Sequence, residues 1–272
     1  MRWPIDKLRI TMVISHKHKF VFVEIPHTGS HSISEQLVKH YGGEPILRKH
    51  ANVTQFLGQA SSDERRYFKF ATVRNPLDTA TTDYAKLKNN HKGQYTNPAM
   101  LIENGGHITA DHLREFNFIR DNNADFSAFF AKFRAKLYNN WFLVGDQHLD
   151  YVIRFENLQD GFSEVLSRLD IEQEEPIPHV NRTKGKEQSF EDFFAPDVHA
   201  MVAASYGPFM QKWGYSFPES WGDVRIPTWS QVQFQALDGA ARIAAGFMTL
   251  DPDHPVLHRA KKTVDFATRK TG

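Results

Sequence analysis

The sequence has no cysteine, which excludes disulfide bonds and thiolate metal sites and fits a protein of a reducing compartment. It also has no apolar run near the roughly 18 residues by which a membrane-spanning helix is recognised. The apolar run at residues 10–14 is too short for a signal peptide and is followed by basic residues. We therefore expect a soluble protein without a membrane span, located in the cytoplasm.

An excess of charge of either sign is absent as well. Lysine and arginine number 33 against 32 aspartate and glutamate residues, so the formal net charge is +1. This balance gives no support to a nucleic-acid-binding function driven by overall charge. The 272 residues, of which 40% are hydrophobic and 13% aromatic, are enough for one large α/β domain with an appendage or for two small domains.

Two common nucleotide-binding patterns are missing, because neither G-x-x-x-x-G-K-[ST] nor G-x-G-x-x-G occurs. The chain instead offers an apolar run, Phe20–Ile25, which predicts a strand and is ended by Pro26. Residues 28–32 are small or hydroxylic and predict a tight turn, and the spacing of Ile33 and Leu37 predicts a helix. Strand, small turn and helix direct backbone N–H groups at an anion. We predict a phosphate or sulfate cradle, and a connection without a ligand is the competing interpretation.

A second apolar run, Phe68–Val73, leads directly into Arg74 and an Asn-Pro pair. Arginine at the end of a strand offers a rigid fork that binds a phosphate through two hydrogen bonds. Thr82 follows eight residues later, where its hydroxyl can reach the same phosphate along a helix. The competing interpretation is a structural clamp in which Arg74 pairs with Asp78.

A third apolar run, Tyr151–Phe155, ends in Glu156, which we interpret as a structural acid. Three strand-ended motifs in this order predict an α/β core with a mostly parallel sheet and ligands at the carboxyl ends of the strands. Residues 124–140 carry aromatic side chains at helical spacing and predict core packing. Residues 231–247 predict an alanine-rich helix, for which the sequence suggests no function.

These stretches, within residues 19–217, resemble the carbohydrate branch of the sulfotransferases that use 3′-phosphoadenosine 5′-phosphosulfate (PAPS). The heptapeptide at residues 26–32, PHTGSHS, resembles their P-K-T-G-[GS]-[ST]-S loop, and the second motif resembles their R-[ND]-P-x-[DE]-R-x-x-S-x-Y. The resemblance implies a three-layer core similar to that of P-loop nucleotide hydrolases. The sequence departs from the family at His27, where lysine is usual, at Thr79, where a second arginine is usual, and at Thr82, where serine is usual.

The resemblance also implies roles for individual residues. The cradle is expected to bind the 5′-phosphosulfate of the donor, and Arg74 and Thr82 its 3′-phosphate. His50 matches a histidine implicated as the base for the acceptor hydroxyl, and His27 is expected near the bridging oxygen; a lone histidine on the surface or in the core is the competing interpretation of His50. A basic loop is expected over the nucleotide, with a solvent-exposed charge run as its alternative. The expected donor-binding residues are Pro26, His27, Thr28, Gly29, Ser30, His31, Ser32, Arg74, Thr82, Arg182, Lys184 and Lys186, and no metal is expected.

The predicted function is transfer of a sulfuryl group from PAPS to a hydroxyl of a carbohydrate or small molecule, which leaves 3′-phosphoadenosine 5′-phosphate (PAP). Two alternatives stay open: a sulfotransferase-like nucleotide-binding protein without turnover, and a P-loop-type kinase that uses ATP. The histidine at position 27 favours the first, and the missing Walker lysine argues against the second. Residues 1–217 are expected to form the α/β domain and residues 218–272 a helical extension. No nucleic-acid partner is expected, and a homo-oligomer is left open.

Overall fold

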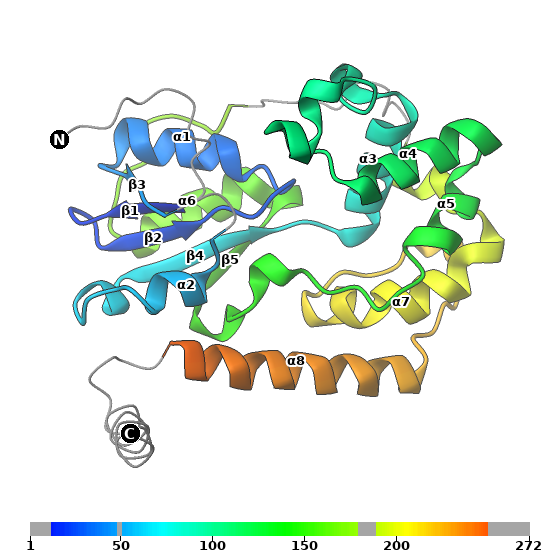
Figure 1. Ribbon diagram of the computed structural model, residues 1–272. Coiled ribbons are helices and arrows are strands. Elements are labelled where there is room, and N and C mark those ends of the chain that lie inside the picture. The colour runs from blue at the N-terminus through cyan, green and yellow to red at the C-terminus, as the bar shows by residue number, and fades with distance from the viewer. Residues whose placement is uncertain (1–11, 48–50, 179–188, 250–272) are drawn as a thin grey trace, which may run out of the picture. The chain divides into compact units, whose positions relative to one another are not determined.

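The structure, a computed structural model, describes residues 12–47, 51–178 and 189–249 (Figure 1). The chain forms two compact units, and each is assembled from separate stretches. The first unit combines residues 1–73, 140–178 and 237–272, and the second combines residues 74–139 and 179–236. The expected domain boundary between residues 217 and 218 stays a prediction.

The first unit is built on a five-stranded sheet with the strand order β3-β1-β2-β4-β5. Strands β2 (Phe20–Val23), β4 (Phe68–Val73) and β5 (Tyr151–Arg154) pair in parallel and coincide with the three apolar runs. Strands β1 (Met12–Ser15) and β3 (Glu44–Pro45) add an antiparallel edge. The predicted α/β architecture is therefore confirmed, with all three motifs following parallel strands.

Helices α1 (Ser30–His40) and α6 (Leu158–Arg168) cover one face of this sheet (Figure 1). Alternate strand residues point at these helices, because side chains along a strand alternate between its two faces. The resulting core is entirely apolar apart from a tyrosine hydroxyl. It is formed by Val13, Phe20, Phe22, Ile33, Leu37, Tyr41, Phe70, Ile153, Phe162, Val165, Leu166 and Ile177.

The opposite face of the sheet is covered by α2 (Val53–Leu57) and, within the first unit, by the C-terminal part of α8 (Thr228–Met248) (Figure 1). Arg242 of α8 lies 3.5 Å from Asp146. Helix α8 contains the helix predicted at residues 231–247 and carries large apolar side chains that stay exposed, namely Trp229, Val232, Leu237, Ile243, Phe247 and Met248. Among the described residues, no helix is both long and apolar enough to cross a membrane.

The second unit contains α3 (Pro76–Lys88), α4 (Ala110–Asn122), α5 (Phe126–Phe133), α7 (His199–Lys212) and the first part of α8. Its core is aromatic, as the stripe in residues 124–140 predicts. Buried rings from several helices pack edge to face or tilted, which is the arrangement that aromatic pairs prefer. The large rings are Tyr84, Phe116, Phe126, Phe129, Phe130, Phe194 and Tyr206.

Helix α5 is shorter than the aromatic stripe. It ends at Phe133, and Arg134 follows as its C-terminal cap residue. The N–H of Tyr138 donates to the carbonyl of Ser205 in α7, at 2.8 Å, rather than to a carbonyl of its own helix. Tyr138, after Phe133, therefore packs from a non-helical segment, which helical spacing alone does not predict.

Candidate functional site

The loop between β2 and α1 turns sharply within a few residues. His27 has a φ of 67° and Gly29 a φ of 72°, so both backbones are left-handed, and Gly29 is the N-cap of α1. Glycine adopts this conformation without cost, whereas histidine is strained there. The strand, turn and helix predicted for this stretch are therefore present. The sharp turn places His27 in a backbone conformation that is unfavourable for a residue with a side chain.

Two hydroxyl groups hold this loop from inside. The Oγ1 of Thr28 and the Oγ of Ser30 both donate to the carbonyl of Ile25, at 2.6 Å and 2.7 Å. Thr28, Ser30 and Ser32 are all buried. Because the Thr28 and Ser30 hydroxyls bond inside the loop, an anion at the loop would be met by backbone N–H groups.

The remaining loop residues lie nearer the surface. Pro26 is half-buried, and the side chains of His27 and His31 are exposed. His31 Nε2 lies 3.4 Å from Oε1 of Glu35 one turn along α1, and both side chains are more than half exposed. An ion pair in such a place contributes little to stability. The side chain of His31 thus points along the helix surface.

The N-terminus of α1 is suited to an anion. Among the described residues no side chain caps this end, and its first turn holds no acidic residue. By contrast, Thr109 caps α4 and Asp125 caps α5 with side-chain oxygens. The first N–H groups of a helix carry partial positive charge and attract anions. The end of α1 therefore has the electrostatic character that a phosphate or sulfate requires.

The third motif packs directly behind the loop, which the sequence did not predict. A Cβ added to Gly29 would lie 3.0 Å from Phe155 and 3.0 Å from Leu158. Two features therefore favour glycine at position 29: its left-handed backbone and the side chains packed behind it. The signal for this packing is long-range, because Phe155 and Leu158 lie far along the chain from Gly29.

A hydrogen bond ties the loop to strand β4. The Oγ1 atoms of Thr28 and Thr72 share a short hydrogen bond, and both residues are buried. Strands β2 and β4 pair in parallel, with Val23 opposite Ala71, so the carboxyl ends of both strands meet at one edge of the sheet. This is the edge at which open α/β sheets bind ligands. Thr72, which the sequence did not single out, precedes Arg74 by two residues.

Arg74 follows the end of β4 and reaches along α3. Its Nε donates to Oδ2 of Asp78 at 2.6 Å, and its Nη2 lies 2.6 Å from the same oxygen. Nη2 also donates to Oγ1 of Thr82 at 3.2 Å. The hydroxyl of Thr82 in turn donates to the backbone carbonyl of Asp78 at 2.8 Å. The structure therefore brings the side chains of Arg74 and Thr82 into contact, and their binding of one phosphate stays a prediction.

The same contacts include the clamp that was the competing interpretation. The side chains of Arg74 and Asp78 are only 13% and 16% exposed, so their ion pair is nearly buried. Asn75 fixes the start of α3, because its Oδ1 accepts a hydrogen bond from the N–H of Leu77 at 2.9 Å. Arg74 is thus oriented before any ligand arrives, and a phosphate would find one edge of the guanidinium occupied by a carboxylate.

Four of the predicted site residues lie outside the described residues. They are the expected base, His50, and the expected cations of the basic loop, Arg182, Lys184 and Lys186. Within the described part of the chain, no group of histidine and carboxylate side chains is arranged to hold a metal ion.

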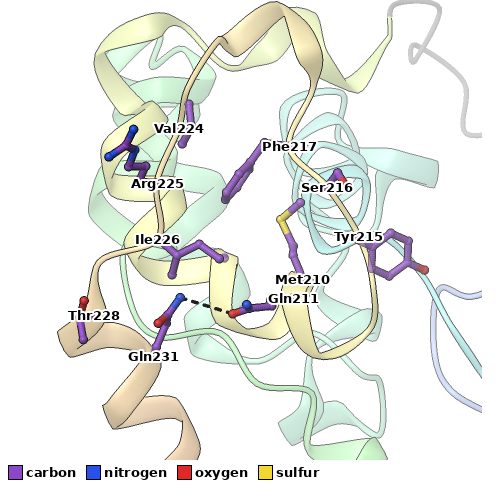
Figure 2. A pocket seen from close by; sticks show the side chains of 11 residues that line it. Met210, Gln211, Tyr215, Ser216, Phe217, Val224, Arg225, Ile226, Thr228 and Gln231 are labelled. Carbon is purple, nitrogen blue, oxygen red and sulfur yellow. Dashed lines mark hydrogen bonds between the residues drawn. The ribbon is translucent and has the colours of Figure 1, made fainter.

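A cavity of about 610 Å³ lies in the second unit, beside the end of α7 and the start of α8 (Figure 2). Met210, Phe217 and Ile226 give it apolar walls, and Nε2 of Gln231 donates to Oε1 of Gln211 at 3.4 Å. None of the predicted site residues lines this cavity. It holds no arrangement of acid, base and nucleophile, so we assign it no chemistry.

Comparison with known proteins agrees with the motifs. No curated protein and no solved structure matched the chain. A family model described as "Sulfotransferase family" matches residues 11–191, which include β2, β4, β5 and the polar residues that follow them. This match covers well over half of the 272 residues. The chain therefore belongs to the sulfotransferase family.

Proposed function

We propose that the protein transfers a sulfuryl group from PAPS to a hydroxyl of a carbohydrate or small molecule, with PAP as the second product. The observation that carries this proposal is the contact between Arg74 and Thr82 directly after β4. A guanidinium and a hydroxyl held together at the carboxyl end of a parallel strand can bind one phosphate group from two sides. The 3′-phosphate is a group that PAPS and PAP carry and that ATP and AMP lack.

The loop between β2 and α1 is proposed to hold the 5′-phosphosulfate. Its backbone N–H groups and the uncapped end of α1 supply positive potential, and the lack of a side chain at Gly29 lets Phe155 and Leu158 pack behind the loop. The transfer breaks the bond between sulfur and the bridging oxygen and forms a new bond between sulfur and the acceptor oxygen. The proton of the acceptor passes to a base, for which His50 is our candidate.

His27 is proposed to offset the charge that develops on the departing phosphate. It is exposed and sits in the turn that precedes the cradle. Lysine, usual in the family, is charged throughout the neutral pH range. Histidine offsets the charge of the phosphate only when it is protonated. Lys184 or Lys186 is the candidate replacement if His27 is not charged in the complex.

The test is calorimetric titration with PAP, AMP and ATP. We expect the wild type to bind PAP much more tightly than AMP, which differs from PAP only in the 3′-phosphate. Arg74→Ala should remove this preference, but it leaves the carboxylate of Asp78 nearly buried without its ion-pair partner. The double variant Arg74→Ala and Asp78→Ala therefore serves as the folded companion, with its thermal unfolding measured beside it.

Equal binding of PAP and AMP by the wild type would contradict the proposal. Tighter binding of ATP together with magnesium would favour the kinase alternative. Selective binding of PAP without transfer from PAPS to any hydroxyl acceptor would favour the nucleotide-binding protein without turnover. The cytoplasm remains our proposed compartment, on the ground that the sequence has no cysteine.

A further inference from the structure

The charge of Arg74 is already matched within the protein. Both Nε and Nη2 lie 2.6 Å from Oδ2 of Asp78, and the two side chains are largely buried. The pair is therefore close to neutral as a unit. A phosphate monoester carries about −1.5 to −2 charges at neutral pH. Arg74 and the neutral hydroxyl of Thr82 supply hydrogen bonds to such a group but little net positive charge.

Lys86 lies on the same side of α3. The helix runs from Pro76 to Lys88, and Asp78, Thr82 and Lys86 follow one another at intervals of four residues. Residues at this interval are neighbours on a helix surface, with about 5–6 Å between their Cβ atoms. Lys86 is therefore the next side chain after Thr82 along the row that begins at Arg74, and it is half-buried.

The electrostatic surroundings of Lys86 show that cations gather here. Burial lowers the pKa of Lys86 first, and repulsion from Arg74 and Lys92 lowers it further, while Asp83 acts in the opposite direction. Arg74 is thus near enough to act on Lys86 despite its own ion pair with Asp78. Among the described charged groups that act on Lys86, Arg74 and Lys92 are cations and Asp83 is a carboxylate. An anion bound beside Thr82 would relieve the repulsion between Arg74 and Lys86.

We propose that Lys86 supplies the net positive charge for the 3′-phosphate and thereby determines the preference for a 3′-phosphorylated nucleotide. This inference rests on the proposed function, because it concerns the phosphate that Arg74 and Thr82 are proposed to bind. Arg74 orients the phosphate and Lys86 attracts it. The family motif assigns its second charge to an arginine at the position of Thr79, so in this chain the charge comes from a later turn of the helix.

The experiment compares affinities for PAP and AMP in four proteins: the wild type, Lys86→Met, Lys86→Arg and Lys88→Met. Lys88 is the matched control, because it lies on the same helix but is exposed, with its Nζ 5.5 Å from the ring centre of Tyr84. We expect Lys86→Met to lower the PAP-to-AMP affinity ratio roughly ten- to 150-fold, which is the contribution of one hydrogen bond to a charged group. Lys86→Arg and Lys88→Met should keep the ratio close to that of the wild type.

The ratio separates this role from a structural one. If the wild type prefers PAP and Lys86→Met leaves the PAP-to-AMP affinity ratio unchanged, Lys86 does not recognise the 3′-phosphate and the inference is overturned. If the wild type shows no preference for PAP, the proposed function itself fails. Should Lys86→Met not fold, Lys86→Gln takes its place, with thermal unfolding of each variant measured first.

Discussion

Gly29 is the residue on which the geometry of the cradle depends most directly. Its φ of 72° is left-handed, and a Cβ there would lie 3.0 Å from Phe155 and Leu158. Gly93 has a similar φ of 69°, but a Cβ there would meet nothing within 4 Å. The two glycines thus share the conformational demand and differ in the space around them.

We expect Gly29→Ala to destabilise the protein more than Gly93→Ala. Both substitutions place alanine in the left-handed region, at a cost of about 1–2 kcal/mol. Gly29→Ala adds overpacking against Phe155 and Leu158, worth about 1–3 kcal/mol. Urea denaturation of the two variants measures the difference. Equal losses of unfolding free energy would show that the side chains behind Gly29 give way freely.

His27 makes the reaction dependent on pH in the proposed mechanism. The protonated imidazole is the active form in this mechanism, so release of PAP from PAPS should slow from acidic to alkaline pH. In His27→Lys the charge persists, and the fall at neutral to alkaline pH should disappear. Both residues carry a Cβ at the same left-handed position, so their folding costs are comparable. A wild-type profile flat from about pH 6 to 9, and unchanged in His27→Ala, would sink this role for His27.

At the scale of the element, a largely buried ion pair links α4 to the end of α5. Arg134, the C-cap residue of α5, donates to Glu115 of α4 through Nη1 and Nη2, at 2.7 Å and 2.8 Å. Their side chains are 22% and 13% exposed. A second pair on α4, Asp111 with Arg114, is 3.1 Å apart but mostly exposed.

We expect Glu115→Gln to lower the free energy of unfolding by about 1–3 kcal/mol, because it leaves a largely buried guanidinium without its carboxylate. Asp111→Asn on the same helix should change it by less than about 0.5 kcal/mol. Thermal or chemical denaturation gives both values. Equal effects of the two substitutions would mean that burial does not distinguish the pairs.

Elements were the scale at which the sequence predicted best. The strand Phe68–Val73 coincides with β4, and the apolar runs at Phe20 and Tyr151 begin β2 and β5. These runs are short, continuous and ended by polar or breaking residues, so local pattern suffices. The contacts of the site depend on partners far along the chain, such as Thr72 for Thr28 and Phe155 for Gly29, and no local pattern encodes them. The pairing of Arg74 with Asp78 was foreseeable only as one of two alternatives.

At the scale of the whole molecule, each of the two units contains part of α8. The chain passes from the second unit to the first between Ala236 and Leu237, inside this helix. Phe234 on one side of that point is 5% exposed, and Ala245 on the other is fully buried. The side chain of Arg65 donates to the carbonyl of Thr249 at 2.7 Å. Residues after 217 therefore contribute to the packing of each unit.

We expect a chain that ends at residue 217 to be strongly destabilised, because the loss of α8 exposes the apolar surface that this helix covers. The measurement is the thermal unfolding and solubility of residues 1–217 beside the full chain. The predicted extension at residues 218–272 would be supported as a separate domain if the shortened chain unfolded at the temperature of the full chain.

The hydrogen bond between Thr28 and Thr72 makes the loop sensitive to whether an insertion in β4 has an odd or an even number of residues. Successive side chains of a strand face opposite sides of the sheet, so a single-residue insertion in β4 would turn Thr72 away from Thr28. An insertion of two residues would restore the side while shifting the contact along the strand. Insertions of an odd number of residues should therefore disrupt the loop more than insertions of an even number, because only the odd ones move Thr72 to the other face of the sheet.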